Sequence, residues 1–139
     1  MKYLGIDYGT KRIGLALSDE GGRLATPYTV LENQAGMMGG LERLIRDEGV
    51  EEIVIGLSMS ESGEENPVQK KIKEFADGLE RRFELPIRFE KEFFSSFEAH
   101  GRQGKESQNA RKESFAKPED LDARAAAVIL QRYLDRLAK

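Results

Sequence analysis

The chain has 139 residues, no cysteine, and 22 basic against 25 acidic side chains, a formal net charge of −3. Without cysteine there is no disulfide, thiolate zinc site or cysteine nucleophile, and the charge argues against wrapping of nucleic acid over the whole surface, though not against a local basic patch. No apolar run is long enough to cross a membrane and the N-terminus lacks a signal-peptide pattern, so we expect one cytoplasmic domain over residues 1–139 with no membrane partner.

The first predicted elements are strands. Within residues 2–18, two period-two apolar runs flank a short Gly-Thr-Lys-Arg turn, a pattern typical of a β-hairpin. After a turn at residues 19–22, residues 23–31 predict a third strand. Three strands joined by such short turns should form an antiparallel meander.

The rest of the chain alternates between helical and strand patterns. Helices are expected over residues 37–48 and 67–82, and strands over residues 52–57 and 86–92, with a polar loop at 58–66. A short helix at 94–100, an irregular polar segment at 101–117 and a long helix at 119–137 follow. Because crossover helices force parallel pairing, the sequence predicts an α/β fold: a mixed five-stranded sheet, with an antiparallel three-strand meander and two parallel strands, flanked by helices on both faces.

Asp7 is the most unusual residue of the hairpin, because it ends the first strand among residues typical of a core. A carboxylate is costly to desolvate unless it is hydrogen-bonded or binds a cation. Three interpretations are open: the first metal ligand of a nuclease, the phosphate-binding hairpin of an actin-like ATPase, or a carboxylate that caps the turn. A length of 139 residues argues against the ATPase, which needs two such domains around its nucleotide.

Two further carboxylates are candidate partners of Asp7 at a metal site. Asp122 heads the terminal helix on an alanine-rich face that must pack on the sheet, although it could merely complement the helix dipole. Glu92 ends the last strand, where α/β sheets place their sites, and Glu90 is its rival on the same strand face. Sites that bind Mg²⁺ or Mn²⁺ and hydrolyse phosphodiesters use such carboxylates.

Through these motifs the chain resembles the YqgF (RuvX) family over essentially its whole length. Residues 7–14 are similar to the family's first-strand motif, and residues 55–57 with the polar loop after them to its Gly-Leu-Pro loop. Glu92 matches the Glu of its Asp-Glu-Arg segment, and residues 121–123 match its terminal-helix Asp segment. Members are described as pre-16S rRNA nucleases and as Holliday-junction resolvases. The resemblance implies an RNase H-like fold and a catalytic triad of Asp7, Glu92 and Asp122 that holds Mg²⁺ or Mn²⁺.

Three positions depart from the family pattern. Ser58 replaces a Pro, and Lys91 and Phe93 replace the Asp and Arg that flank the family's Glu. The absence of that Arg removes a bidentate phosphate clamp that Phe cannot supply. These departures keep the three carboxylates but favour an alternative in which the domain binds nucleic acid, or assists ribosome assembly, without cleaving.

Candidate substrate contacts adjoin the carboxylates in the sequence. Lys11 and Arg12 follow Asp7 in the turn, and Ser96 follows Glu92. Residues 100–117 carry five basic against two acidic side chains and include Arg102, Lys105, Arg111 and Lys112. We expect these residues to contact a nucleic-acid backbone, with a plain polar loop as the alternative for the segment. The only histidine, His100, is interpreted as a surface or capping residue.

The sequence therefore predicts a metal-dependent nuclease acting on structured RNA, with 5′-end processing of pre-16S rRNA implied by the resemblance. One alternative is a Holliday-junction resolvase-like DNA endonuclease, which needs a dimer to cut two strands symmetrically. The other is the non-catalytic module. The expected partner is nucleic acid, either structured RNA or branched DNA, and the sequence is compatible with a monomer or a homodimer.

Overall fold

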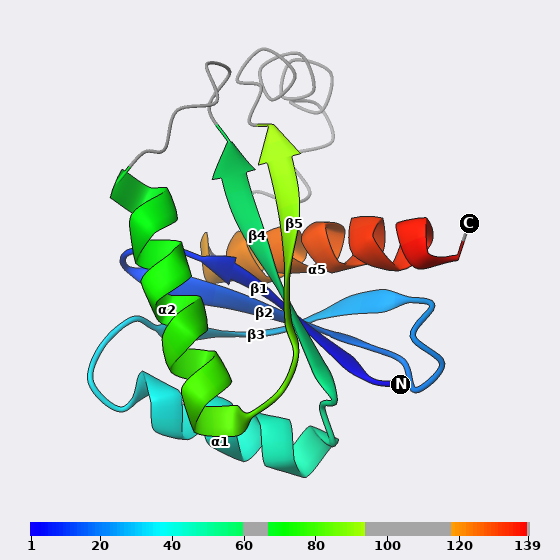
Figure 1. Ribbon diagram of the computed structural model, residues 1–139, viewed down its shortest axis with the longest axis horizontal. Coiled ribbons are helices and arrows are strands. Elements are labelled where there is room, and N and C mark those ends of the chain that lie inside the picture. Colours follow the sequence, from blue (N-terminus) through cyan, green and yellow to red (C-terminus); the bar gives the residue numbers. More distant parts are fainter. Residues whose placement is uncertain (60–66, 94–117, 139) are drawn as a thin grey trace.

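The computed structural model describes residues 1–59, 67–93 and 118–138 and contains a five-stranded sheet with helices on both faces (Figure 1). The strands are β1 (Tyr3–Tyr8), β2 (Arg12–Ser18), β3 (Ala25–Glu32), β4 (Glu52–Met59) and β5 (Ile87–Phe93). The helices are α1 (Met37–Glu48), α2 (Pro67–Phe83) and α5 (Pro118–Leu137).

The sheet has the strand order β3-β2-β1-β4-β5 and is mixed. The pairs β1–β2 and β2–β3 are antiparallel, whereas β1–β4 and β4–β5 are parallel. In the parallel part, Ile6 lies opposite Ile55, and Ile55 lies opposite Phe89. The predicted mixed α/β sheet, with a meander and two parallel strands, is therefore confirmed.

The two faces of the sheet pack against different helices. On one face, α1 and α2 cover an apolar cluster that includes Leu4 and Ile6 of β1 (Figure 1). On the other face, α5 crosses the strands and forms a second cluster around Leu130. The helix comes close at Gly56, where an added Cβ would lie 2.4 Å from Ile129 Cδ1. A side chain at this position of β4 would force the Ile129 side chain of α5 to repack.

Buried carboxylates of the sheet anchor the C-terminal half of α5. The Tyr133 hydroxyl donates to Glu52 Oε2 at 2.9 Å, and Arg136 forms an ion pair with Glu90, which is only 5% exposed. Burial, together with the hydrogen bond to Glu52, raises the pKa of Tyr133 to about 12, so its hydroxyl stays protonated and can donate to Glu52 at a higher pH than an exposed tyrosine could. These contacts set how α5 lies across the sheet and thus where its first turn is placed.

Most elements lie at or near their predicted positions, and α1 has the predicted bounds. The start of β3 was predicted two residues too early. The N–H groups of Arg23 and Leu24 donate to Asp19 Oδ1 in the preceding turn, at 2.7 and 3.2 Å, so the strand begins only at Ala25.

The predicted helix at 94–100 and the segment at 101–117 lie outside the described residues. None of the described helices is long and apolar enough to cross a membrane.

Candidate active site

Asp7 lies near the end of β1, partly buried, directly opposite Gly14 of β2. Residues directly opposite in an antiparallel pair share one face of the sheet, with Cβ atoms about 5 Å apart. Gly5, two residues earlier, faces α5, because a Cβ there would lie 2.7 Å from Leu130 Cβ. Since strand side chains alternate, Asp7 also points to the face that α5 covers.

Gly14 brings the first turn of α5 against this part of the sheet. A Cβ at position 14 would lie 2.0 Å from the backbone oxygen of Asp122, a distance that no side chain can occupy. The missing side chain therefore lets Asp122 sit directly above the hairpin. Combined with the cross-strand spacing, this contact places the backbone of Asp122 within about 7 Å of Asp7 Cβ. Two carboxylate-bearing residues, 115 positions apart in sequence, thus meet on one face.

An ion pair fixes the side chain of Asp122 at this position. Arg12 Nε donates to Asp122 Oδ2 at 2.8 Å, and the two side chains are 35% and 30% exposed. Asp122 therefore does more than complement the dipole of its helix, which was the alternative from the sequence. The residue Arg12 was expected to contact substrate, and no sequence pattern indicated its pairing with Asp122.

The third candidate carboxylate lies in β5. The backbone of Glu92 pairs with that of Ser58, whereas its side chain is outside the described part of the structure. Its rival Glu90 is paired with Arg136, which lies about four turns beyond Asp122, or ~21 Å along α5. Among the described residues, no group of three or more His, Cys, Asp or Glu side chains could hold a metal. Glu90 is thus not the third member of a cluster with Asp7 and Asp122.

The other predicted contact residues divide into two groups. Lys11 is exposed in the turn between β1 and β2, next to Arg12. The remaining predicted contact residues all lie outside the described residues: Ser96, Arg102, Lys105, Arg111 and Lys112. His100, which was interpreted as a surface or capping residue, lies outside them too.

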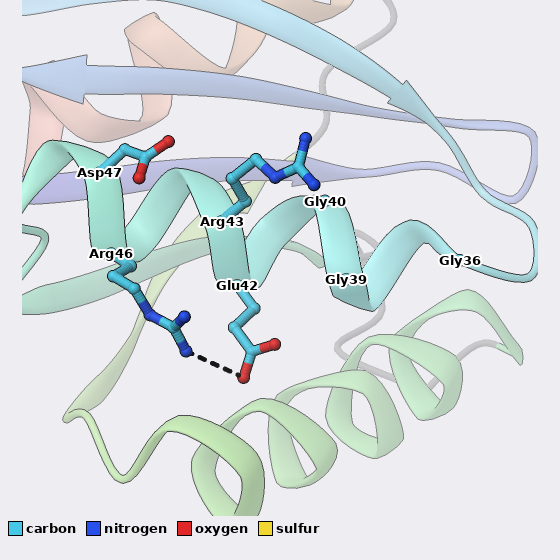
Figure 2. Close-up of a pocket in the computed structure, with 7 residues that line it drawn as sticks. All are labelled: Gly36, Gly39, Gly40, Glu42, Arg43, Arg46 and Asp47. Carbon is cyan, nitrogen blue, oxygen red and sulfur yellow. Dashed lines mark ion pairs between the residues drawn. The ribbon is translucent and has the colours of Figure 1, made fainter.

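A hollow elsewhere on the surface does not belong to this site. It is lined by residues of α1 and the turn before it, including Glu42, Arg43 and Arg46 (Figure 2). Arg46 and Glu42 form an ion pair of 3.7 Å across one helical turn. Because α1 packs on the face opposite α5, the hollow lies on the other side of the sheet from Asp7 and Asp122.

Comparison with known proteins places the chain in a family. Residues 1–136 match the family model described as "RuvX: Holliday junction resolvase". The chain belongs to the RuvX family. It is 40% identical over 138 residues to a protein of Maridesulfovibrio salexigens, covering 98% of this chain and 99% of the relative. It is 37% identical to a protein of Moorella thermoacetica, covering 100% and 98%. Both relatives are named "Putative pre-16S rRNA nuclease".

Solved structures support the fold. The RuvC of Thermus thermophilus in complex with a Holliday junction substrate aligns with a TM-score of 0.58 at 14% identity, covering 99% of this chain and 96% of that one. The fowlpox virus Holliday junction resolvase aligns with a TM-score of 0.57 at 14% identity, covering 99% of both chains. The RNase H-like fold implied by the resemblance is confirmed, and membership of the RuvX family supports a hydrolase of nucleic-acid phosphodiester bonds.

Proposed function

We propose that this RuvX family member is a divalent-metal-dependent nuclease of structured RNA that processes the 5′ end of pre-16S rRNA. The observation that carries the proposal is the meeting of Asp7 and Asp122 on one sheet face, at the close contact between Gly14 and α5. Relatives at 37–40% identity, which bear the name of a pre-16S rRNA nuclease, support the choice of substrate. A role in ribosome assembly implies a cytoplasmic location.

The donor set fits Mg²⁺ or Mn²⁺. Carboxylate oxygens are the ligands that these hard cations prefer, and Asp7 and Asp122 come from rigid elements that hold them near each other. Glu92 is the proposed third ligand. When bound at such a site, the metal supplies an activated water and neutralises charge on the scissile phosphate. The carboxylates would hold and orient the bound cation, and the closely packed face of α5 would exclude bulk water from one side of the site.

Cationic side chains beside the carboxylates are proposed to hold the substrate. Lys11 is exposed at the rim of the site, and Arg12 lies next to it. Each can bind a backbone phosphate, Arg12 with the planar fork that also suits carboxylates. The basic residues Arg102, Lys105, Arg111 and Lys112, with Ser96, are proposed to extend this contact along the nucleic acid.

Two other functions remain as alternatives with their own supporting observations. Cleavage of branched DNA is favoured by the description of the family model as a Holliday junction resolvase. A non-catalytic nucleic-acid-binding or assembly module is favoured by Lys91 and Phe93, which replace the family's Asp and Arg. A homodimer would support the first alternative, because symmetric cutting of a junction needs two sites.

A nuclease assay with matched substrates tests the proposed function. We expect purified protein to cleave a pre-16S rRNA 5′ fragment in Mg²⁺ or Mn²⁺ and to leave it intact in excess chelator. A four-way DNA junction and a linear duplex of the same length, assayed side by side, measure the preference for RNA. Preferential cleavage of the junction would support the resolvase instead. Salt-dependent RNA binding without cleavage of any substrate would support the non-catalytic module.

Metal binding should also appear as stabilisation of the fold. A ligand that binds only the native state raises the free energy of unfolding, by about 2.7 kcal/mol at 100 times its Kd, which corresponds to roughly 5–10 °C in Tm. We expect Mn²⁺ to raise the Tm of the wild type in a saturable way, and Asp7→Asn to lose most of this increase. Asp77→Asn, which changes an exposed carboxylate of α2, is the control and should respond like the wild type. An unchanged response in Asp7→Asn would show that Asp7 is not a ligand.

A further inference from the structure

The ion pair between Arg12 and Asp122 links the proposed metal site to the proposed phosphate site. Arg12 begins β2 and Asp122 lies near the start of α5, so the contact joins residues 110 positions apart. The donor–acceptor distance of 2.8 Å indicates a strong, charge-assisted hydrogen bond. Both side chains remain about one-third exposed, which leaves the pair open to exchange with ions from solvent.

The charges around the pair explain why exchange is expected. Asp7 and Asp122 carry negative charges on the same face of the sheet, and nearby like charges disfavour each other. Arg12 supplies a compensating positive charge directly at Asp122. A divalent cation coordinated by Asp122 would supply a larger one. The cation and the guanidinium would then lie a few ångströms apart and repel each other.

We propose that Arg12 and the metal compete for Asp122, and that metal binding releases Arg12 to bind a phosphate of the nucleic acid. This inference rests on the proposed function, because it takes Asp122 as a metal ligand. A guanidinium suits the exchange, since the same planar fork of donors fits carboxylate and phosphate. Metal and nucleic acid then bind synergistically, each raising the affinity for the other by the same factor.

Calorimetric titration of Mn²⁺ into the 139-residue chain tests the competition in the absence of RNA, so no cleavage takes place. Arg12→Gln removes the competing guanidinium, and we expect Mn²⁺ to bind up to about fivefold more tightly, the fold-change that a partly exposed ion pair accounts for. Lys11→Gln is the matched control. It removes the same charge one residue earlier, from an exposed side chain, whereas the ion pair to Asp122 is made by Arg12. Its Mn²⁺ affinity should change much less.

RNA binding by the same two variants tests the release of Arg12. With Mn²⁺ present, we expect Arg12→Gln to bind a short RNA hairpin severalfold more weakly than the wild type. In chelator the same substitution should have little effect, because Arg12 is then held by Asp122. Lys11→Gln should weaken binding to a similar extent in both conditions. Gel analysis of the hairpin after each measurement establishes that it is still intact.

The outcomes separate this inference from the proposed function. Equal Mn²⁺ affinities for Arg12→Gln and Lys11→Gln would overturn the competition, and so would weaker binding by Arg12→Gln, because Arg12 would then orient Asp122 for the metal. An equal decrease of RNA affinity with and without Mn²⁺ would overturn the release. In contrast, an Asp122→Asn variant that binds Mn²⁺ as the wild type does would overturn the metal site itself.

Discussion

Asp122→Asn is expected to reduce RNA cleavage by at least about a hundredfold, the rate equivalent of ~2.7 kcal/mol. The substitution is nearly isosteric, so α5 should still pack on Gly14. It removes the ligand charge, whereas the amide still accepts a hydrogen bond from Arg12 through its oxygen. Single-turnover cleavage of the pre-16S rRNA fragment, with protein in excess so that all of the RNA is bound, measures the effect independently of RNA affinity.

Asp135→Asn is the matched control for this variant. Asp135 is exposed near the other end of α5, where it accepts a hydrogen bond from Gln131 at 3.0 Å. It should cleave at the wild-type rate. If Asp122→Asn also cleaves at that rate, the carboxylate of Asp122 takes no part in the reaction.

A charge variant of the basic segment should show the converse behaviour. Neutralising Arg102, Lys105, Arg111 and Lys112 together should weaken RNA binding and make its salt dependence shallower, by roughly one unit of slope for each phosphate that the variant no longer binds. Cleavage of bound RNA should be retained. If the RNA affinity of this variant and its dependence on salt are unchanged, the basic segment does not contact the nucleic acid. The interface would then consist of the hairpin and the region around the carboxylates.

Gly14→Ala is expected to have the largest effect on stability, a decrease of about 3 kcal/mol in the free energy of unfolding. The new Cβ would lie 2.0 Å from the Asp122 backbone oxygen, and a backbone atom cannot turn aside as a flexible side chain can. The first turn of α5 must therefore shift, which should carry Asp122 away from Asp7 and reduce cleavage and Mn²⁺ affinity together. Chemical denaturation measures the stability.

Gly39→Ala is the control for this substitution. Gly39 lies in α1, and an added Cβ there meets no atom within 4 Å. Alanine should leave the stability unchanged or raise it by up to ~1 kcal/mol, because glycine is the poorer helix former. Equal stability of Gly14→Ala and the wild type would contradict the close contact between β2 and α5.

The sequence by itself determined most of the described elements and the sense in which the strands pair, because both follow from local patterns. The strand order, in which β4 lies beside β1, came only from the structure. Apolar periodicity located the strands and helices, and Gly49 marked the end of α1, where it takes the left-handed conformation with φ 67°. Short turns required antiparallel pairing and crossover helices required parallel pairing, so the mixed sheet followed from connection lengths. The predicted start of β3 was wrong because two backbone N–H groups that the pattern assigned to the strand, those of Arg23 and Leu24, donate hydrogen bonds to the side chain of Asp19 instead.

Only the tertiary structure decided which charged side chains meet. Arg12 pairs with Asp122 and Glu90 with Arg136, over 110 and 46 positions of sequence, and no local pattern encodes such pairs. Both depend on how α5 crosses the sheet, which is set by its close contacts at Gly14 and Gly56 and its hydrogen bond from Tyr133 to Glu52. The sequence could nominate Asp7 and Asp122 because each was a carboxylate in an apolar context, but the packing of α5 brought them to one face.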